Sequence, residues 1–337
     1  MIIVTGAAGF IGSNLIRGIR ASSDLYLERG SKISENILAV DDLTEGTKFN
    51  NLSNSDIDDY WDKDLLLKNI EEDKINFKVD CIFHQGACSD TQERDEYYMM
   101  ENNYRYSVKL FEWCQQKKVP FIYASSAAIY GSDTDLSSPK LVFNDKHNSY
   151  KPLNIYGYSK LLFDKYVSKK LSISKNMSQV VGLRYFNVYG PGESHKGNMA
   201  SVIYHFNKQA LQDGEIRLFE GSHGWEDGEH RRDFVYVEDV VSVNLWFLIN
   251  KGLSGIYNVG TGNQWPFNEV ADEIFKWHGI KPNKKYISFP EGLESIYQAY
   301  TQANIDKLRG MGYEHKFNTI EEGIKKYLDY INGPKKQ

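Results

Sequence analysis

Short apolar runs alternate with amphipathic segments along the first half of the chain. The runs are predicted to be buried strands, and they lie at residues 1–4, 37–42, 80–84, 121–126 and 179–185. Between them, apolar residues recur at helical spacing at residues 10–20, 102–117 and 156–170. Strands that alternate with helices form parallel βαβ units, so the pattern predicts an α/β fold with a Rossmann-type, doubly wound parallel sheet.

The pattern loosens after residue 185. Glycine-rich polar loops are expected at residues 190–192 and 221–229, and short strands return at residues 233–237 and 255–260. No internal repeat or linker separates the two parts. We therefore expect a smaller, discontinuous α/β substrate domain that is interleaved with the first. The expected nucleotide-binding domain spans residues 1–183 plus about 234–262, and the substrate domain about 184–233 plus 263–337.

Composition excludes several classes of protein. The 337 residues carry a net charge of −5, which argues against a general nucleic-acid binder. Cys81, Cys88 and Cys114 form neither a disulfide framework nor a metal-ligand spacing, so we expect reduced thiols and no metal site. No apolar run reaches the roughly 20 residues that a membrane span needs, and the N-terminus is itself the first predicted strand. We expect a cytoplasmic protein without membrane or nucleic-acid partners.

The first glycine turn is typical of a dinucleotide-binding site. Gly6, Gly9 and Gly12 follow the first apolar run with the spacing G-x-x-G-x-x-G. Glycines at these places allow a tight turn, close approach of a pyrophosphate, and close packing of the first helix. The helix N-terminus favours the anion. A plain strand–helix turn is the alternative for this motif alone.

Other ligand-binding positions lie at the ends of the next strands. Asp41 ends the second predicted strand, where an acidic residue binds the adenosine ribose in such folds. It lies farther from the glycines than usual, because a polar segment occupies residues 22–36. Small residues follow the strand at residues 80–84, and Ser126 ends the strand at residues 121–126. The carboxyl ends of these parallel strands are expected to meet at one edge of the sheet.

Tyr156 and Lys160 form a Tyr-x-x-x-Lys pair at helical spacing, which places both polar tips on one helix face. An ammonium group and a bound nicotinamide cation would lower the pKa of the phenol from about 10 towards that of a useful base. Ser126 is expected to hydrogen-bond the same substrate oxygen. Most such pairs are solvated helix faces, but the glycine turn and the serine strand end favour catalysis here.

The chain resembles the extended short-chain dehydrogenase/reductase superfamily over nearly its whole length. The resemblance rests on residues 4–14, 41–49, 86–89, 123–128, 154–160 and 184–191, of which the glycine and tyrosine motifs belong to the whole superfamily. Further segments narrow the resemblance to the ADP-L-glycero-D-manno-heptose 6-epimerase family, which acts in lipopolysaccharide core biosynthesis. They lie at residues 195–201, 219–222, 232–237 and 297–303, with His195-Lys196-Gly197 and residues 297–303 the most specific.

The resemblance implies a mechanism. ADP-D-glycero-β-D-manno-heptose and its L-glycero epimer would interconvert by transient oxidation at C6″ with bound NADP. Tyr156 would take the hydroxyl proton, and Lys196 would serve the opposite orientation of the rotated aldehyde. Without the resemblance, Lys196 would be interpreted as a solvated loop lysine.

The resemblance also assigns contacts. Cofactor contacts fall on positions in the first domain, on Val188 and on Lys196; the residues are Gly6, Gly9, Phe10, Ile11, Gly12, Asp41, Asp42, Lys48, Lys63, Gln85, Gly86, Ala87, Cys88, Ser89, Asn102, Lys160, Val188 and Lys196. Contacts to the ADP-sugar fall in the substrate domain, on Asn187, Asn198, His205, Phe219, Glu220, Gly221, Ser222, Arg232 and Tyr297. An arginine suits a diphosphate because its planar fork donates two bonds at once.

Departures from the family pattern leave alternatives open. Asp42 stands where the family has asparagine, and Gln85 where it has glutamate. A second carboxylate near the ribose would repel a 2′-phosphate, whereas Lys48 and Lys63 would attract it. NADP is expected, with NAD as the alternative. An acidic insertion at residues 225–229 has no assigned role.

Two other functions are weighed against the heptose epimerase. Another nucleotide-sugar epimerase or dehydratase is possible, although a 4,6-dehydratase would carry an acidic pair where Ala127-Ala128 follow Ser126. A non-catalytic dinucleotide sensor would have no reason to keep Tyr156, Lys160 and Lys196. The resemblance further implies a homo-oligomer, a pentamer in relatives, for which the sequence carries no independent signal.

Overall fold

The chain divides into two compact units, each built from several segments. The computed structural model describes residues 1–22, 36–44, 46–131, 143, 150–174 and 176–334. Unit 1 contains residues 1–126, 155–184 and 240–257, and unit 2 contains residues 127–154, 185–239 and 258–337. In the expectation from sequence, residues 127–154 belonged to the nucleotide-binding domain. Most of the polar segment at residues 22–36 lies outside the described residues.

A seven-stranded sheet forms the centre of unit 1, in the order β11-β6-β5-β4-β1-β2-β3. The strands are β1 (Ile2–Thr5), β2 (Ile37–Asp41), β3 (Asp59–Asp62), β4 (Cys81–His84), β5 (Phe121–Ser126), β6 (Val180–Tyr185) and β11 (Gly255–Val259). Neighbours such as β1 and β4 pair in parallel, with Ile3 opposite Ile82. Every residue of β1, β2 and β4 is buried, as expected for a parallel sheet covered on both faces. The predicted Rossmann-type architecture is confirmed.

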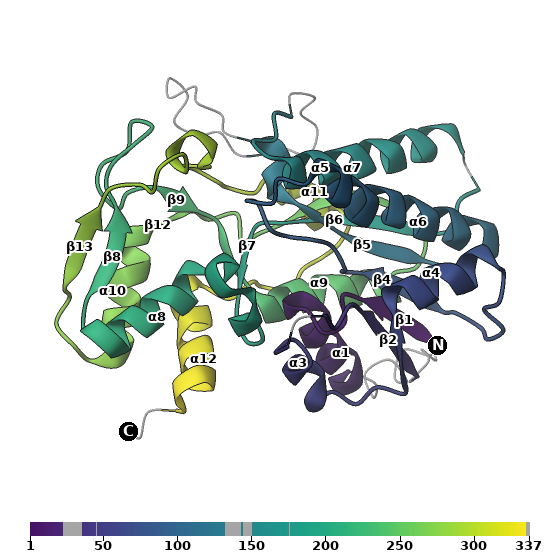
Figure 1. Ribbon diagram of the computed structural model, residues 1–337, viewed down its shortest axis with the longest axis horizontal. Helices are drawn as coiled ribbons and strands as arrows, with labels where there is room; N and C mark the ends of the chain where they lie inside the picture. The colour runs from purple at the N-terminus through teal and green to yellow at the C-terminus, as the bar shows by residue number, and fades with distance from the viewer. Residues whose placement is uncertain (23–35, 45, 132–142, 144–149, 175, 335–337) are drawn as a thin grey trace. The chain divides into compact units, whose positions relative to one another are not determined.

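Helices cover both faces of this sheet (Figure 1). They are α1 (Phe10–Ala21), α3 (Asn50–Ser53), α4 (Lys63–Glu71), α5 (Glu96–Met99), α6 (Tyr106–Lys117), α7 (Ile155–Ile173) and α9 (Val237–Ile249), and a π-helical turn, η1 (Met100–Arg105), joins α5 to α6. Phe111 of α6 and Phe163 of α7 pack with Ile3 and Leu38 in one core. Across the sheet, Gly18 of α1 lies so close to α9 that an added Cβ would stand 2.3 Å from Val241 Cγ1.

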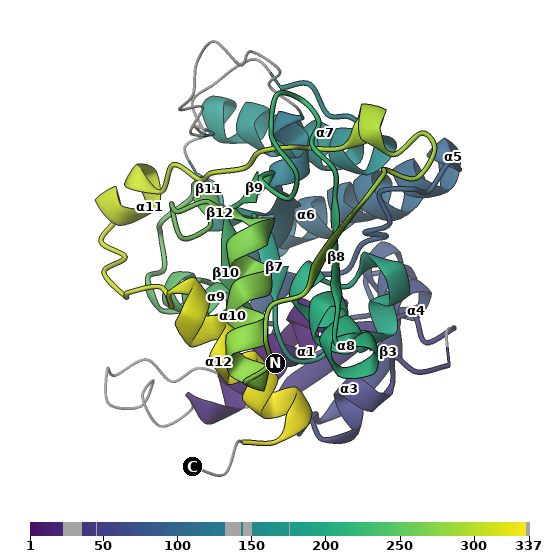
Figure 2. The ribbon, with the colours of Figure 1, turned by 90° about the vertical axis from the view of Figure 1, so that its left-hand side faces the viewer.

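Unit 2 consists of short paired strands and a group of helices (Figure 2). The strand pairs are β7 (Asn187–Tyr189) with β10 (Phe234–Tyr236), β8 (Ile216–Phe219) with β13 (Lys284–Ile287), and β9 (Arg231–Arg232) with β12 (Trp265–Pro266). The helices are α8 (Val202–Asp213), α10 (Phe267–His278), α11 (Asp306–Gly310) and α12 (Ile320–Asn332), with short turns η2 (Ala127–Tyr130), η3 (Ser194–Met199) and η4 (Glu294–Ile296). Asn207 of α8 hydrogen-bonds His278 of α10 and Asn332 of α12, so one amide joins three helices.

Asp233, which precedes β10, organises the loops of unit 2. Its fully buried carboxylate accepts hydrogen bonds from Thr261 N and Oγ1, Gly262 N and Ala303 N, at 2.7 to 3.0 Å. Burial raises the pKa of Asp233 to about 6, and these four bonds oppose that shift. One side chain therefore fixes segments that are about 70 residues apart in the sequence.

His84 at the end of β4 joins unit 1's glycine turn to the helix layer. Ser107 Oγ donates to Asn103 O at 2.6 Å, so it accepts from His84 Nε2 at 2.7 Å. His84 Nδ1 then accepts from Thr5 Oγ1 at 2.7 Å, and Thr5 Oγ1 receives the N–H of Gly86 at 3.3 Å. This order of donors requires a neutral imidazole. Burial, followed by the charge of Lys160, lowers the pKa of His84 to about 3.

We expect His84 to make the protein less stable in acid. Its pKa is about 3 when folded and roughly 6.5 when unfolded, so between these values the unfolded chain binds a proton that the folded chain does not. Stability should fall with falling pH by up to about 1.4 kcal/mol per unit in this window. His84→Gln should flatten that slope in urea unfolding between about pH 6.5 and 4.5. His315→Gln, at an exposed position, is the control, and an unchanged slope in His84→Gln would contradict the assignment.

Candidate active site

The glycine turn has the close backbone contacts of a dinucleotide cradle. Gly6 adopts a left-handed conformation, with φ of +67°, and an added Cβ would lie 2.5 Å from the nitrogen of Gly86. A Cβ at Gly12 would lie 2.1 Å from the carbonyl oxygen of Gly6. Gly9 is the N-cap of α1. A side chain at Gly6 or Gly12 would collide with protein backbone, so both glycines are needed for the tight packing of the turn. A tight turn of this kind before a helix N-terminus suits a pyrophosphate.

Asp41 braces the glycine turn. Its carboxylate accepts hydrogen bonds from Ala8 N at 2.7 Å, from Lys48 Nζ at 2.5 Å and from Asp42 N at 2.7 Å. The side chain is 4% exposed. Asp41 thus ties β2 to the turn after β1, and these three bonds explain why an acidic residue is needed at the end of this strand.

Asp42, Lys48 and Lys63 form a charged group next to Asp41. Lys48 Nζ also donates to Asp42 O at 3.1 Å. Burial alone would raise the pKa of Asp42, but hydrogen bonds from Thr44 and the charges of Lys63 and Lys48 hold it below its ordinary value. The lowered pKa keeps the Asp42 carboxylate ionised at neutral pH. Its partial exposure leaves it accessible to a ligand. The structure brings together the three residues that the sequence analysis connects with the ribose.

The loop after β4 is held by a residue that the sequence analysis missed. Asn103 Oδ1 accepts from Cys88 N at 2.8 Å, and its Nδ2 donates to Cys88 O at 2.9 Å and to Ser159 Oγ at 3.1 Å. Asn103 is 1% exposed, whereas the predicted contact Asn102 is partly exposed. Gln85 Nε2, at the start of the loop, donates to Asn244 Oδ1 at 3.3 Å. Asn103 lies on the π-helical turn η1. Helical periodicity does not predict such a turn, so the sequence pattern does not indicate that Asn103 faces the loop.

Ser126, Tyr156 and Lys160 lie together where β5 meets the first turns of α7. Ser126 hydrogen-bonds the phenolic oxygen of Tyr156. Lys160 is 5% exposed, and its Nζ donates to Ala124 O at 2.9 Å. Ser159 Oγ donates to Tyr156 O at 2.7 Å, so the helix turn that carries the tyrosine is also tied to Asn103.

Burial and Ser126 control the pKa of Tyr156 in the protein alone. Burial raises this pKa, and the hydrogen bond from Ser126 only partly offsets the rise. Burial also lowers the pKa of Lys160 to about 8, and its Nζ donates to a carbonyl of β5. The lowering expected from the sequence depends in addition on the positive charge of a bound nicotinamide.

Lys196 of unit 2 lies on η3, between the hydrogen-bonded Glu193 and Gly197. Glu193 is fully buried, and its carboxylate accepts from Gly190 N, Ser201 Oγ and Ser201 N. Gly197 has φ of +52°, which breaks the helical turn directly after the lysine. Burial lowers the pKa of Lys196, and Glu193 opposes that shift. The segment therefore holds a lysine that gives up its proton more easily than an ordinary surface lysine.

Arg232, Tyr297 and Phe219 form an aromatic cluster in unit 2. The guanidinium of Arg232 lies 4.8 Å from the ring centroid of Tyr297, and a hydrogen bond joins the two side chains. Phe219 stacks on Phe289 at 4.3 Å. Arg232 is 6% exposed, so its charge lies in apolar surroundings. A flat base and a phosphate are ligands that such a combination of rings and guanidinium can bind.

His230 belongs to this cluster and was not predicted. Its ring packs edge-on against Tyr297 at 5.3 Å, and its Nε2 lies 2.9 Å from Ser222 Oγ, which also contacts His223 Nδ1. Burial and then Arg232 lower the pKa of His230 to about 4. The imidazole thus adds no charge beside Arg232. In the sequence, His230 looks like one more polar residue directly after the acidic insertion.

The other predicted substrate residues are spread over unit 2. Asn187 accepts from Thr301 Oγ1 at 3.0 Å. Its neighbour Val188, predicted as a cofactor contact, pairs with Val235 across β7 and β10. Asn198 is exposed on η3, and His205 lies on α8 with its ring against Tyr204.

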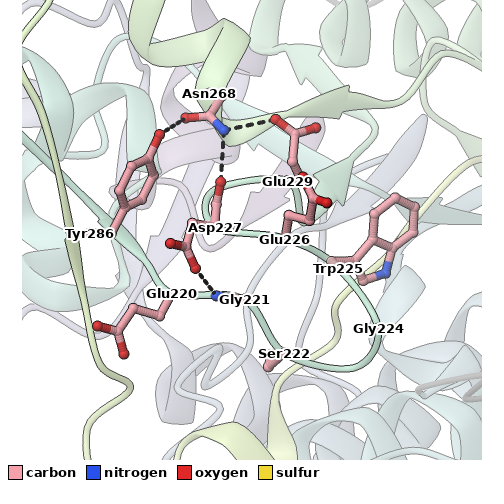
Figure 3. A pocket seen from close by; sticks show the side chains of 10 residues that line it. All are labelled: Glu220, Gly221, Ser222, Gly224, Trp225, Glu226, Asp227, Glu229, Asn268 and Tyr286. Atoms are coloured by element: carbon pink, nitrogen blue, oxygen red, sulfur yellow. Dashed lines mark hydrogen bonds between the residues drawn. The ribbon is translucent and has the colours of Figure 1, made fainter.

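The acidic insertion lines an open hollow of about 920 Å³ beside Glu220–Ser222 (Figure 3). Asp227 Oδ1 accepts from Gly221 N at 2.7 Å, and Asn268 Nδ2 donates to Asp227 O and to Glu229 Oε1. Trp225 stacks on Tyr300 with an interplanar angle of 6°. These contacts give the insertion a defined shape next to the predicted sugar-nucleotide residues. Among the described residues, no cluster of potential metal ligands and no helix able to span a membrane occurs.

Known proteins are similar to this chain in sequence and in fold. The sequence profile described as "NAD dependent epimerase/dehydratase family" matches residues 2–260. ADP-L-glycero-D-manno-heptose-6-epimerase from Alkalilimnicola ehrlichii is 49% identical over 331 residues, covering 98% of this chain and 97% of the relative.

Two solved structures are also similar. The Helicobacter pylori ADP-L-glycero-D-manno-heptose-6-epimerase has a TM-score of 0.78 and 33% identity, with 98% of this chain and 96% of that chain covered. Thermus thermophilus UDP-glucose 4-epimerase, solved as a complex with NAD, has a TM-score of 0.73 and 27% identity, with 98% and 99% covered. The chain belongs to the NAD dependent epimerase/dehydratase family and, within it, to the ADP-L-glycero-D-manno-heptose-6-epimerases.

Proposed function

We propose that the protein interconverts ADP-D-glycero-β-D-manno-heptose and ADP-L-glycero-β-D-manno-heptose by transient oxidation at C6″. The observation that carries the proposal is the site of Ser126, Tyr156 and Lys160 beside a glycine cradle, in a chain 49% identical to a heptose epimerase over 98% of its length. Arg232 and the aromatic cluster of unit 2 support a nucleotide diphosphate as the carrier of the sugar. The product would serve lipopolysaccharide core biosynthesis.

The protein's own groups would move protons and hold the substrate. Tyr156 takes the proton of the C6″ hydroxyl, and Ser126 keeps the phenolic oxygen oriented. A bound nicotinamide dinucleotide supplies reversible hydride exchange, and its positive charge when oxidised favours the phenolate that burial disfavours. Lys196 transfers the proton for the opposite face, a role that suits its lowered pKa. The pairing of Lys196 with Tyr156 is part of the proposal.

The cofactor is proposed to be NADP, held by the glycine cradle, by the loop after β4 and by the charges of Asp42, Lys48 and Lys63. Lys48 and Lys63 favour a 2′-phosphate, and Asp42 opposes it. We also propose a cytoplasmic homo-oligomer, pentameric as the resemblance implies. The described cysteines, none of them in a disulfide, support a reducing compartment.

The test of the function is incubation of the purified protein with ADP-D-glycero-β-D-manno-heptose, without added cofactor, followed by separation of the two C6″ epimers. Conversion to an equilibrium mixture would support both the reaction and a retained, recycled cofactor. Absence of conversion, even after addition of NADP or NAD, would overturn the substrate assignment.

Tyr156→Phe should reduce epimerisation by about 100-fold or more, because it removes only the oxygen that transfers the proton. Thermal unfolding should stay close to that of the unaltered protein. Tyr158→Phe is a matched control, since this tyrosine lies two residues further along α7 and is 46% exposed. Activity near that of the unaltered protein in Tyr156→Phe would contradict the catalytic role.

Lys196→Met should leave cofactor binding intact and block epimerisation, because the second face of the carbonyl then has no proton donor. Cofactor content after purification and epimer ratios after incubation measure the two effects. Lys281→Met, at an exposed position of unit 2, provides the control. Loss of the cofactor from Lys196→Met would show that this lysine acts mainly through the cofactor contact that the resemblance assigns to it, and not by proton transfer.

Asp42→Asn should strengthen NADP binding about fivefold to tenfold relative to NAD, because it removes one negative charge beside the 2′-phosphate position. Fluorescence titration of the cofactor-free protein with each dinucleotide measures the ratio. An equal change for both dinucleotides would show that Asp42 does not face the 2′-position. Asp59→Asn, an exposed carboxylate on β3, controls for the change in net charge.

A further inference from the structure

A buried charged cluster lies on α7, one turn beyond the proposed catalytic lysine. Asp164 is 1% exposed. Its Oδ1 accepts from Tyr123 Oη at 2.9 Å, and its Oδ2 accepts from Ser125 Oγ at 2.9 Å and from Arg184 Nε at 2.8 Å. Asp164 follows Lys160 by four residues, which places the two on one helix face. Nothing in the proposed mechanism uses this carboxylate.

The surrounding donors require Asp164 to be an anion. Arg184 is always charged, and its side chain is 4% exposed, so a neutral partner would leave a buried charge uncompensated. Gly182 on β6 makes room for the network, because an added Cβ would stand 2.4 Å from Tyr123 Oη. Burial and the neighbouring Asp164 raise the pKa of Tyr123 well above its ordinary value, so the phenol remains a donor.

Lys160 and Asp164 contact the same stretch of β5. Lys160 Nζ bonds the carbonyl of Ala124, while Asp164 bonds the side chains of Tyr123 and Ser125 on either side of it. Burial lowers the pKa of Lys160 to about 8, and Asp164 is the strongest influence that opposes this, followed by Cys88.

Other titratable groups lie near Lys160 and Asp164, on the elements that pack against α7. Cys88 on the loop after β4 and His84 on β4 interact with Lys160, and Tyr156 precedes it by one helical turn. Tyr123 of β5 and Arg184 of β6 face Asp164. Among these groups, Asp164 is the one fixed anion beside the lysine, since the cysteine and tyrosines are neutral at neutral pH.

We propose that Asp164 is a positioning residue for the epimerase reaction, which keeps the buried Lys160 in its ammonium form beside Tyr156. This inference rests on the proposed function for its catalytic meaning. Its electrostatic part concerns only residues of unit 1. The network of Arg184, Tyr123 and Ser125 holds the carboxylate in place, so that its charge acts on the lysine rather than on solvent.

The test is an NMR titration of protein carrying ¹³C at the ε-carbon of lysine, with the Lys160 signal assigned from Lys160→Arg. Asp164→Asn should lower the titration midpoint of Lys160 by about one pH unit, and Arg184→Gln should raise it, because the anion then lacks its counter-charge. A purely structural network would not move the midpoint in opposite directions. Glu112→Gln, which removes a partly exposed carboxylate paired with Lys170 at the far end of α7, is the control.

A second variant covers the case in which Asp164→Asn does not fold because Arg184 is left unpaired. The double variant Asp164→Asn/Arg184→Gln removes both buried charges together, and it should still lower the Lys160 midpoint. Asp164→Glu keeps the charge and should restore it in part. An unchanged midpoint in both Asp164→Asn and the double variant would overturn the proposal.

Turnover gives the catalytic readout. The alkaline limb of the pH profile for epimerisation should move to lower pH in Asp164→Asn or the double variant by the same amount as the midpoint. A midpoint that moves while the pH profile does not would overturn the positioning role. If the unaltered protein fails to convert the heptose substrate, the proposed function fails, while the titration still decides whether Asp164 controls Lys160.

Discussion

The proposed catalytic site depends on how unit 1 tolerates charge in its interior. Lys160 and Asp164 lie on the buried face of α7, where an isolated charge would be strongly disfavoured. Each is satisfied by β5 or β6: Lys160 by the carbonyl of Ala124, and Asp164 by two hydroxyls and Arg184. These bonds fix the position of α7 against the sheet. The direction in which Tyr156 points follows from that position.

A second constraint acts on the loops that follow β1, β2 and β4. The glycines of the first turn permit backbone contacts closer than any side chain allows, and Gly86 of the next loop meets Gly6 there. Asp41 and His84 hold the two loops by hydrogen bonds from buried or nearly buried positions. Side chains that look like ligands in the sequence therefore serve partly as supports. Asp41 is the clearest case, because its oxygens are bonded to Ala8, Asp42 and Lys48.

The sequence predicts most strands of the unit 1 sheet, since buried parallel strands appear as short apolar runs, but it misses the partly exposed edge strand β3. The strand predicted at residues 121–126 is β5, and the helix predicted at residues 156–170 lies within α7 (Ile155–Ile173). Unit 2 is less predictable. Its strands of two to four residues are too short for a period to emerge, as β9 and β12 show.

The residues of the candidate site also differ in how well the sequence predicts them. Glycine spacing and Tyr-x-x-x-Lys indicate a dinucleotide and a phenol base, because these motifs are local in the sequence. Asn103, His84 and His230 are missed, since each works through contacts with residues elsewhere in the chain, namely Cys88, Thr5 and Tyr297. Burial raises the pKa of Tyr156 in the protein alone, and spacing along a helix does not reveal that burial.

Burial shifts the pKa values of these titratable groups, in both units, in the direction that favours the neutral form. It disfavours charge on His84, on Lys160 and on Lys196, and it raises the pKa of Tyr156. In unit 1 these shifts leave Tyr156 a neutral acid and weaken the cation of Lys160, while the charge of Asp164 opposes the shift of the lysine. In unit 2, Glu193 opposes the shift of Lys196 in the same way. In the proposed reaction the same groups must release and accept a proton within one turnover, which requires pKa values that the charge of a ligand can move.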